Sequence, residues 1–503
     1  MNIGTMLNEE MSKDVASQRT DVSATNGRTR MVQWTIQALR NCTDVERLAT
    51  IGYPDELGEL ESIEYSTLRD FFGQSNALWF EPERHYWWRP AYIRRQIGSR
   101  FPIVTMVHGL GYPYQLPLLL ASLAIPQAPG DVVIAPSEVS ANVLREQCKI
   151  LSAVSTFPIK IPAVTVVPYG VPLASPMPAS EAKQLLGWNS VPVVLFLGRL
   201  SLLDKADFRA LFEATARLFD KGVGFQLVLA GAAHSGEVND LWRLVDAFGI
   251  GHAVRIYPDV SDIEKHCLLS ACDIFVSPSN ALSESFGLSI IEAMFHECAI
   301  VCSNWSGYRE LIDDGENGLL VGTIWCNAES ENKNLEYLGD ATRLQTFTDG
   351  LGFSIKHPVA LNVAEFSRAL ESLIRNEGQR IRLGKSARRK AVKYYTLDRF
   401  VASLMTVFRE SIVESSGQDT PTPIPQFYRV FEQYAQTVWN GDAEVTADPE
   451  ANIERSITTG GLSDPQSLIY LERATQGKAV LESNHLMFDL LRNGLFEIKN
   501  STT

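Results

Sequence analysis

The chain has 503 residues, more than one hydrophobic core usually supports, so we expect two or three domains. Apolar residues make up 45% and charged residues 21%, which excludes a disordered or fibrous protein. The net charge of −14 argues against a protein built to coat nucleic acid or an anionic membrane, because both need a surplus of Lys and Arg. A phosphate group would have to be bound by a local group of cations.

The amino-terminal part predicts one α/β domain. Residues 1–27 are polar, and we expect them to precede a domain that spans residues 28–175. Within it, residues 101–107 and 131–135 are apolar runs of strand length, and each ends in a short polar loop. Such runs are typical of buried parallel strands.

A second α/β domain is predicted over residues 176–395. Its apolar runs are residues 191–197, 225–230, 253–257, 273–276 and 298–302. Stretches of helical periodicity, such as residues 208–219 and 263–270, separate most of them. This alternation predicts a parallel sheet covered on both faces. We therefore expect two doubly wound, Rossmann-like domains that face each other across a cleft, where ligands of such sheets bind.

The carboxyl-terminal part contains segments that do not belong to the two predicted sheets. A polar insertion interrupts the second domain near residues 324–360, and helical patterns follow at 363–375 and 379–395. Residues 396–419 predict a helix that returns to the first domain. Residues 420–503 predict a proline-rich linker and a small appendage to which the sequence assigns no function.

The cysteines and the apolar segments predict the compartment. Seven cysteines without a regular framework favour a reducing environment. Cys298 and Cys302 bracket an apolar run, so we interpret them as strand residues and predict no metal site. The first 30 residues lack the apolar core of a signal peptide, and the most apolar stretch, residues 116–125, is too short to span a bilayer. We expect a cytoplasmic protein without a transmembrane segment.

Residues 284–294 (Glu-Ser-Phe-Gly-Leu-Ser-Ile-Ile-Glu-Ala-Met) are the most informative segment. Gly287 is predicted to open a helix, where free backbone N–H groups and the helix dipole attract an anion such as a diphosphate. Glu284 precedes the helix and Glu292 lies within it, so one carboxylate could bind a sugar and the other a ribose. Two surface acids on one helix remain the alternative.

A second segment carries cations at the end of a predicted strand. Gly198 allows a turn there, and Arg199 and Lys205 could donate to a diphosphate as charge develops on its leaving oxygen. An ordinary surface Arg and Lys is the alternative explanation. This loop and residues 284–294 are both predicted to bind a diphosphate, and the presence of both segments in one domain favours the binding role.

These segments resemble the retaining GT-B glycosyltransferases of the family 4 type, which include glycogen synthases and sucrose synthases and carry a Glu-x7-Glu motif. The resemblance covers about residues 100–410. It implies that Glu284 contacts the hydroxyls of the donor sugar and Glu292 the ribose. It also implies that the backbone of Phe286, Gly287 and Leu288 contacts sugar and diphosphate, and that Gly198 lies at the donor.

The resemblance extends less completely to the first domain. His108, in the loop His-Gly-Leu-Gly after a predicted strand, occupies the position of a family His-Gly loop that faces the donor sugar. A structural histidine at a strand end is the alternative. The family usually opens with a short strand and a glycine-rich loop, whereas residues 1–27 are polar here, which leaves the acceptor side open.

The resemblance implies transfer of a sugar from a nucleotide-sugar, with a UDP-sugar favoured, to an acceptor with retention of anomeric configuration. The acceptor could be a saccharide, a lipid-linked glycan, a small molecule or a peptide. We expect the nucleotide-sugar as co-substrate, no other cofactor, no metal and no nucleic acid. The alternatives are a phosphorylase or nucleotide-sugar epimerase of the same fold, and a catalytically inactive sugar-nucleotide-binding subunit.

Overall fold

The computed structural model describes residues 1–6, 27–51, 61–63, 67–112, 115–155, 159–188, 191–202, 205–234, 236–325, 359–416, 445–447 and 496–498. Most of three predicted segments lies outside the described residues: the polar start, the insertion near 324–360 and the appendage after 420. By internal contacts the chain divides into Met1–Ile424 and Pro425–Thr503. In the second unit, β16 (Val445–Ala447) pairs antiparallel with β17 (Phe496–Ile498).

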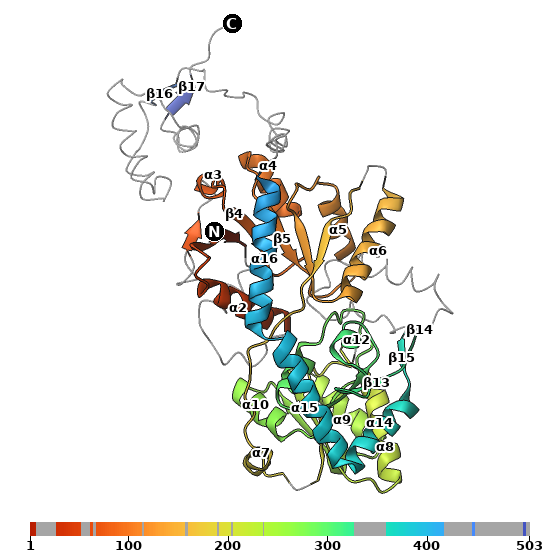
Figure 1. Cartoon of the computed structure of the whole chain (residues 1–503). Helices are drawn as coiled ribbons and strands as arrows, with labels where there is room; N and C mark the ends of the chain where they lie inside the picture. The colour runs from red at the N-terminus through yellow and green to blue at the C-terminus, as the bar shows by residue number, and fades with distance from the viewer. Residues whose placement is uncertain are drawn as a thin grey trace. The chain divides into compact units, whose positions relative to one another are not determined.

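The first domain of Met1–Ile424 contains a seven-stranded parallel sheet (Figure 1). In spatial order the strands are β3 (Glu61–Ile63), β2 (Arg47–Ile51), β1 (Asn2–Thr5), β4 (Ala77–Glu81), β5 (Ile103–Met106), β6 (Val132–Ala135) and β7 (Ala163–Val166). The helices on one face are α3 (Leu68–Phe72), α4 (Trp88–Ile97), α5 (Gln115–Leu123) and α6 (Glu138–Val154). The other face is covered by α2 (Gly27–Arg40) and α16 (Leu397–Ser415).

The first strand corrects the predicted domain boundary. Residues 2–5 are buried and pair with β2 on one side and β4 on the other, so the first sheet includes residues that precede the predicted start at 28. Asn2 and Thr5 made this segment look like a polar terminus. Four residues, two of them polar, are too short a run to show the apolar pattern by which buried strands are recognised in a sequence.

The second domain contains a six-stranded parallel sheet. Its order is β10 (Val254–Pro258), β9 (Gln226–Gly231), β8 (Val193–Leu197), β11 (Ile274–Ser277), β12 (Ala299–Ser303) and β13 (Leu319–Val321). One face packs on α8 (Phe208–Asp220), α9 (Glu237–Ala247) and α14 (Val363–Arg375). The other packs on α7 (Ala179–Leu185), α10 (Asp262–Ala271), α11 (Leu288–Phe295) and α15 (Glu377–Tyr394). A 3-10 turn (Gly251–Ala253), the short α12 (Tyr308–Leu311) and the ribbon β14 (Thr323–Trp325)–β15 (Val359–Leu361) complete it.

The chain crosses between the domains twice, and the two crossings are hydrogen-bonded to each other. The N–H of Val171 donates to the carbonyl of Tyr395, and the N–H of Leu397 donates to the carbonyl of Val171. After the second crossing, α16 lies across the first sheet, where Phe408 packs edge-on against Phe80 at 5.0 Å. The predicted fold class, two parallel doubly wound domains, is thus confirmed.

Candidate active site

The candidate residues of the second domain lie at the point where its strand order reverses. From β8 the sheet runs to β9 and β10 on one side and to β11, β12 and β13 on the other. Arg199 and Lys205 follow β8, and Glu284 follows β11. Ligands of open parallel sheets bind outside the carboxyl ends of the strands at such a reversal. The sequence thus placed both charged loops at the edge where the topology favours a ligand.

Lys205 and Glu284 form an ion pair across this reversal. The Nζ of Lys205 lies 2.7 Å from Oε2 of Glu284, whose side chain is 9% exposed. The hydroxyl of Tyr308 donates to the same oxygen at 3.0 Å. Burial raises the pKa of Glu284, but the charge and hydrogen bond of Lys205, with those from Tyr308 and the Phe286 N–H, outweigh burial and hold it below the usual value. Glu284 is therefore a carboxylate at neutral pH.

Gly287 allows the backbone to turn from Glu284 into α11. Its φ of +111° is left-handed, a conformation that favours glycine. A Cβ at this position would lie 2.7 Å from the ring of Tyr308. Tyr308 thus contacts Glu284 and packs against Gly287, and no side chain caps α11. The first N–H groups of α11 are suited to an anion.

Glu292 is held by a second lysine. Its Oε1 lies 2.7 Å from the Nζ of Lys265 on α10, and both side chains are 17% exposed. Lys265 also lies 3.4 Å from Asp262, which in turn pairs at 2.6 Å with Arg30 on α2 of the first domain. The carboxylate is therefore fixed by a charge network that includes both domains. The spacing of glutamates could not reveal Lys265, because it lies on another helix.

His108 lies in the loop after β5 and contacts the Glu284 loop through its backbone. The Ser285 hydroxyl donates to the His108 carbonyl at 2.5 Å. The imidazole Nε2 lies 2.6 Å from the carbonyl of Pro82, so Nε2 carries the proton and Nδ1 is an acceptor. Burial lowers the pKa of His108 to about 4, so the ring is neutral at neutral pH. Its Nε2 already has a partner inside the first domain.

The structure brings most of the predicted residues to one place. The Lys205 side chain packs beside Gly198, at 3.2 Å from where a Cβ would stand. Arg199 is half-buried in the same loop. Phe286 is buried, and its ring packs edge-on against Tyr169 at 5.7 Å. Leu288 is the first residue of α11. Tyr308, in contrast, was not among the predicted residues.

The two domains also meet beside this loop. The carboxylate of Glu310, on α12, accepts the N–H groups of Glu138 and Val139 at 3.1 and 3.0 Å, at the start of α6. The Ser140 hydroxyl donates to the carbonyl of Ser285 at 3.0 Å. Negative charge at a helix start is favourable, so Glu310 joins the domains next to the candidate site.

Part of the second domain matches a known family. Residues 180–339 match the model of the glycosyl transferases group 1 family. The matched range contains every second-domain residue of the candidate site. A D-inositol 3-phosphate glycosyltransferase from Actinosynnema mirum is 30% identical over 230 residues, which are 43% of this chain and 52% of that protein. The chain thus spans about half the length of this relative.

Solved structures share the arrangement of both domains. The sucrose-phosphate synthase of Thermosynechococcus elongatus has a TM-score of 0.56 and 18% identity, covering 82% of this chain and 99% of that one. Anabaena Alr3699/HepE in complex with UDP has a TM-score of 0.56 and 16% identity, covering 81% and 100%. The fold is therefore the GT-B fold. In the part of the chain that the structure describes, no helix is long and apolar enough to cross a bilayer.

Proposed function

We propose that this protein is a glycosyltransferase that moves a sugar from a nucleotide-sugar to an acceptor with retention of anomeric configuration. The observation that carries the proposal is the half-buried Lys205–Glu284 pair at the reversal of the second sheet, inside the region that matches the glycosyl transferases. A carboxylate beside a cation suits a ligand that has sugar hydroxyls next to a diphosphate. The donor would lie between the loops after β8 and β11.

Lys205 can bind Glu284 and the diphosphate of the donor at the same time. An ammonium has three N–H donors, and the bond to Glu284 uses one of them. We assign the other two to phosphate oxygens, which the first N–H groups of α11 and the nearby Arg199 would also contact. Glu284, kept ionised by Lys205 and Tyr308, would accept hydrogen bonds from sugar hydroxyls. Glu292 would accept those of the ribose, in the orientation that Lys265 fixes.

The proposed chemistry follows from these positions. The bond between the anomeric carbon and the diphosphate oxygen breaks, and the acceptor hydroxyl oxygen bonds to that carbon on the same face. The hydroxyl proton passes to the departing diphosphate. Cations and helix N–H groups stabilise the charge on the leaving oxygen, so a divalent cation is not required for this task. We propose UDP as the nucleotide, the ligand present in the HepE structure of the same fold.

A donor screen tests the proposal. The protein is heated with UDP-, GDP- or ADP-glucose, and stabilisation by one nucleotide-sugar identifies the donor, since a ligand that binds the folded state raises the melting temperature. Release of free nucleoside diphosphate is then measured with and without an acceptor panel of glycosides. We expect release that depends on the acceptor. A changed sugar configuration without any release would instead identify an epimerase.

The proposed ribose contact makes a specific prediction. Glu292→Ala should weaken donor binding by roughly 10- to 150-fold, because a hydrogen bond to a charged group contributes ~1.5–3 kcal/mol. Titration calorimetry with the donor from the screen measures the change. Glu213→Ala is the control, since Glu213 pairs with Arg217 on an exposed face of α8, outside the candidate site. Equal donor affinity of folded Glu292→Ala and the control would rule out the ribose contact.

A further inference from the structure

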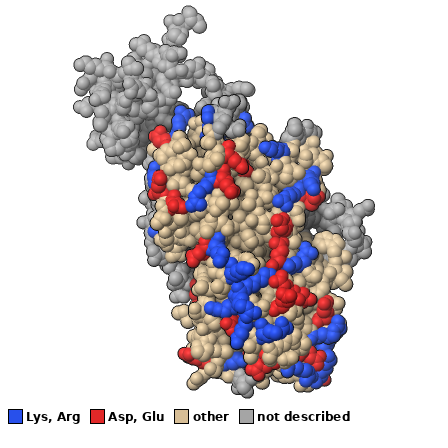
Figure 2. Space-filling view, viewed as in Figure 1, with Lys and Arg blue, Asp and Glu red and all other residues tan. Residues whose placement is uncertain are grey.

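The helix α15 has a charge opposite to that of the chain. It contains seven Lys and Arg residues and one acid, Glu377, whereas the whole chain has 45 basic and 59 acidic residues. Figure 2 shows Lys and Arg gathered on the face where α15 lies in Figure 1. Three exposed cations, Lys385, Arg389 and Lys393, lie between its middle and its carboxyl end, and Arg399 follows near the start of α16. We call these four residues the basic face.

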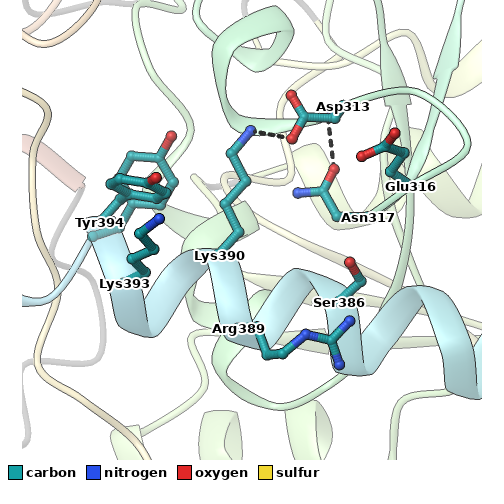
Figure 3. Close-up of a pocket in the computed structure, with 9 residues that line it drawn as sticks. Asp313, Glu316, Asn317, Ser386, Arg389, Lys390, Lys393 and Tyr394 are labelled. Carbon is teal, nitrogen blue, oxygen red and sulfur yellow. Dashed lines mark hydrogen bonds and ion pairs between the residues drawn. The ribbon is translucent and has the colours of Figure 1, made fainter.

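Neighbouring cations of α15 are already engaged. Lys390 pairs with Asp313 at 2.8 Å, and Figure 3 shows its side chain directed to that carboxylate. Arg388 donates to backbone carbonyls that include that of Ala174. By contrast, Lys385, Arg389 and Arg399 have no ion-pair partner among the residues that the structure describes. The charge of the basic face is therefore available to a partner.

The basic face borders two adjoining hollows. One, of about 470 Å³, is lined by all four of its residues, and Glu297 is the single acid in that lining. The other, of about 520 Å³, is drawn in Figure 3 and shares Arg389 and Lys393 with the first. From Lys385 to Lys393 the helix rises ~12 Å, so the cations are distributed rather than focused on one point.

Apolar side chains are exposed among these cations. Val392 is 39% and Tyr394 50% exposed, and both line the hollows that the basic face borders. Cations with exposed apolar and aromatic residues on one helical surface are typical of contact with a bilayer interface, where tyrosine is favoured and Lys and Arg attract anionic headgroups. A single soluble anion would need neither the apolar residues nor the spread of charge.

We propose that the basic face is a docking surface for an anionic lipid bilayer, held by phosphate-bearing headgroups without insertion of the helix. The net charge of −14 does not oppose this, because exposed charges more than about 8 Å away are largely screened at physiological ionic strength. The opposite side of α15 packs on the second sheet through Leu383, Ala387 and Ala391. Contact is therefore peripheral.

Cosedimentation with vesicles tests the proposal. The full-length chain is mixed with phosphatidylcholine vesicles that contain or lack 30% phosphatidylglycerol, at roughly 0.05 M and 0.3 M salt. We expect binding only to the anionic vesicles and only at the lower salt. The triple variant Lys385→Ala/Arg389→Ala/Lys393→Ala should bind roughly 100-fold more weakly, since each Lys or Arg near such a surface contributes about fivefold.

A matched variant separates the effect of the basic face from the effect of the net charge of the chain. Arg217→Ala/Lys221→Ala/Arg243→Ala removes three exposed cations of the second domain outside the basic face and changes the net charge equally. We expect it to bind anionic vesicles like the unmodified chain. Equal weakening of both variants, or equal binding to both kinds of vesicle, overturns the proposal. Absence of vesicle binding combined with retention on a polyphosphate or RNA column would also overturn it and would indicate a soluble polyanion.

Discussion

Lys205→Ala should lower kcat by roughly 10²–10³-fold, the range seen when one preorganised donor to a developing oxyanion is removed. Lys205 is a cation fixed at 2.7 Å from Glu284, and the proposed diphosphate would gain charge beside it. The KM for the donor should rise less than kcat falls, because the interaction is strongest in the transition state. Arg199→Ala should act in the same direction.

The loss of kcat must be separated from general effects of removing a lysine. Lys221→Ala removes a lysine of the same domain, whose ammonium pairs with Glu371 at 2.8 Å on an exposed surface. Steady-state kinetics with the donor from the screen should show wild-type kcat for this control. Circular dichroism establishes that each variant is folded. Wild-type turnover in both folded Lys205→Ala and Arg199→Ala would show that the diphosphate does not bind there.

Asp131→Asn should destabilise the first domain by roughly 3–5 kcal/mol, the usual effect of breaking a buried ion pair. Asp131 accepts two hydrogen bonds from Arg94, at 2.6 and 2.7 Å, and Arg94 is 1% exposed. The same carboxylate accepts the N–H groups of Ile103 and Ala128 at 2.9 and 2.8 Å. It therefore fixes the start of β5, the strand that leads to His108. The shift of the urea unfolding transition measures the loss.

Two further variants identify the cause of that destabilisation. Asp240→Asn makes the same chemical change in an exposed pair with Arg243 and should leave the transition unchanged. Arg94→Met/Asp131→Asn should be less destabilised than Asp131→Asn alone, because the buried guanidinium charge that Asp131→Asn leaves unpaired is then removed as well. An unfolding transition of Asp131→Asn that matches the wild type would mean that the buried pair does not support the domain.

The regular part of the fold could be predicted from local sequence. The helix predicted at 363–375 has those bounds, and the strand predicted at 273–276 is shifted by one residue to Ile274–Ser277. Long apolar runs bounded by polar loops identify buried strands without knowledge of their neighbours. The first strand lacked this signal. Asn2–Thr5 is short and half polar, and its identity depends on pairing with strands that lie 45 and 75 residues away.

Only those parts of the candidate site that lie close together in the sequence could be predicted. Glu284 and Glu292 could be named from the motif of residues 284–294 and its resemblance to a known family, but their partners Lys205, Tyr308 and Lys265 meet them only through the fold. Lys205 was assigned to the diphosphate, and its bond to Glu284 was not expected. Pairwise contacts between side chains on different elements leave no periodic signal in one sequence.

The most direct test of the account is the product formed without a divalent cation. The chain is incubated in EDTA with the donor from the screen and a glycoside acceptor, and NMR of the anomeric proton identifies the new linkage. We predict undiminished transfer and a product with the anomeric configuration of the donor. Transfer abolished by EDTA and restored by manganese, or a product of inverted configuration, would contradict the account.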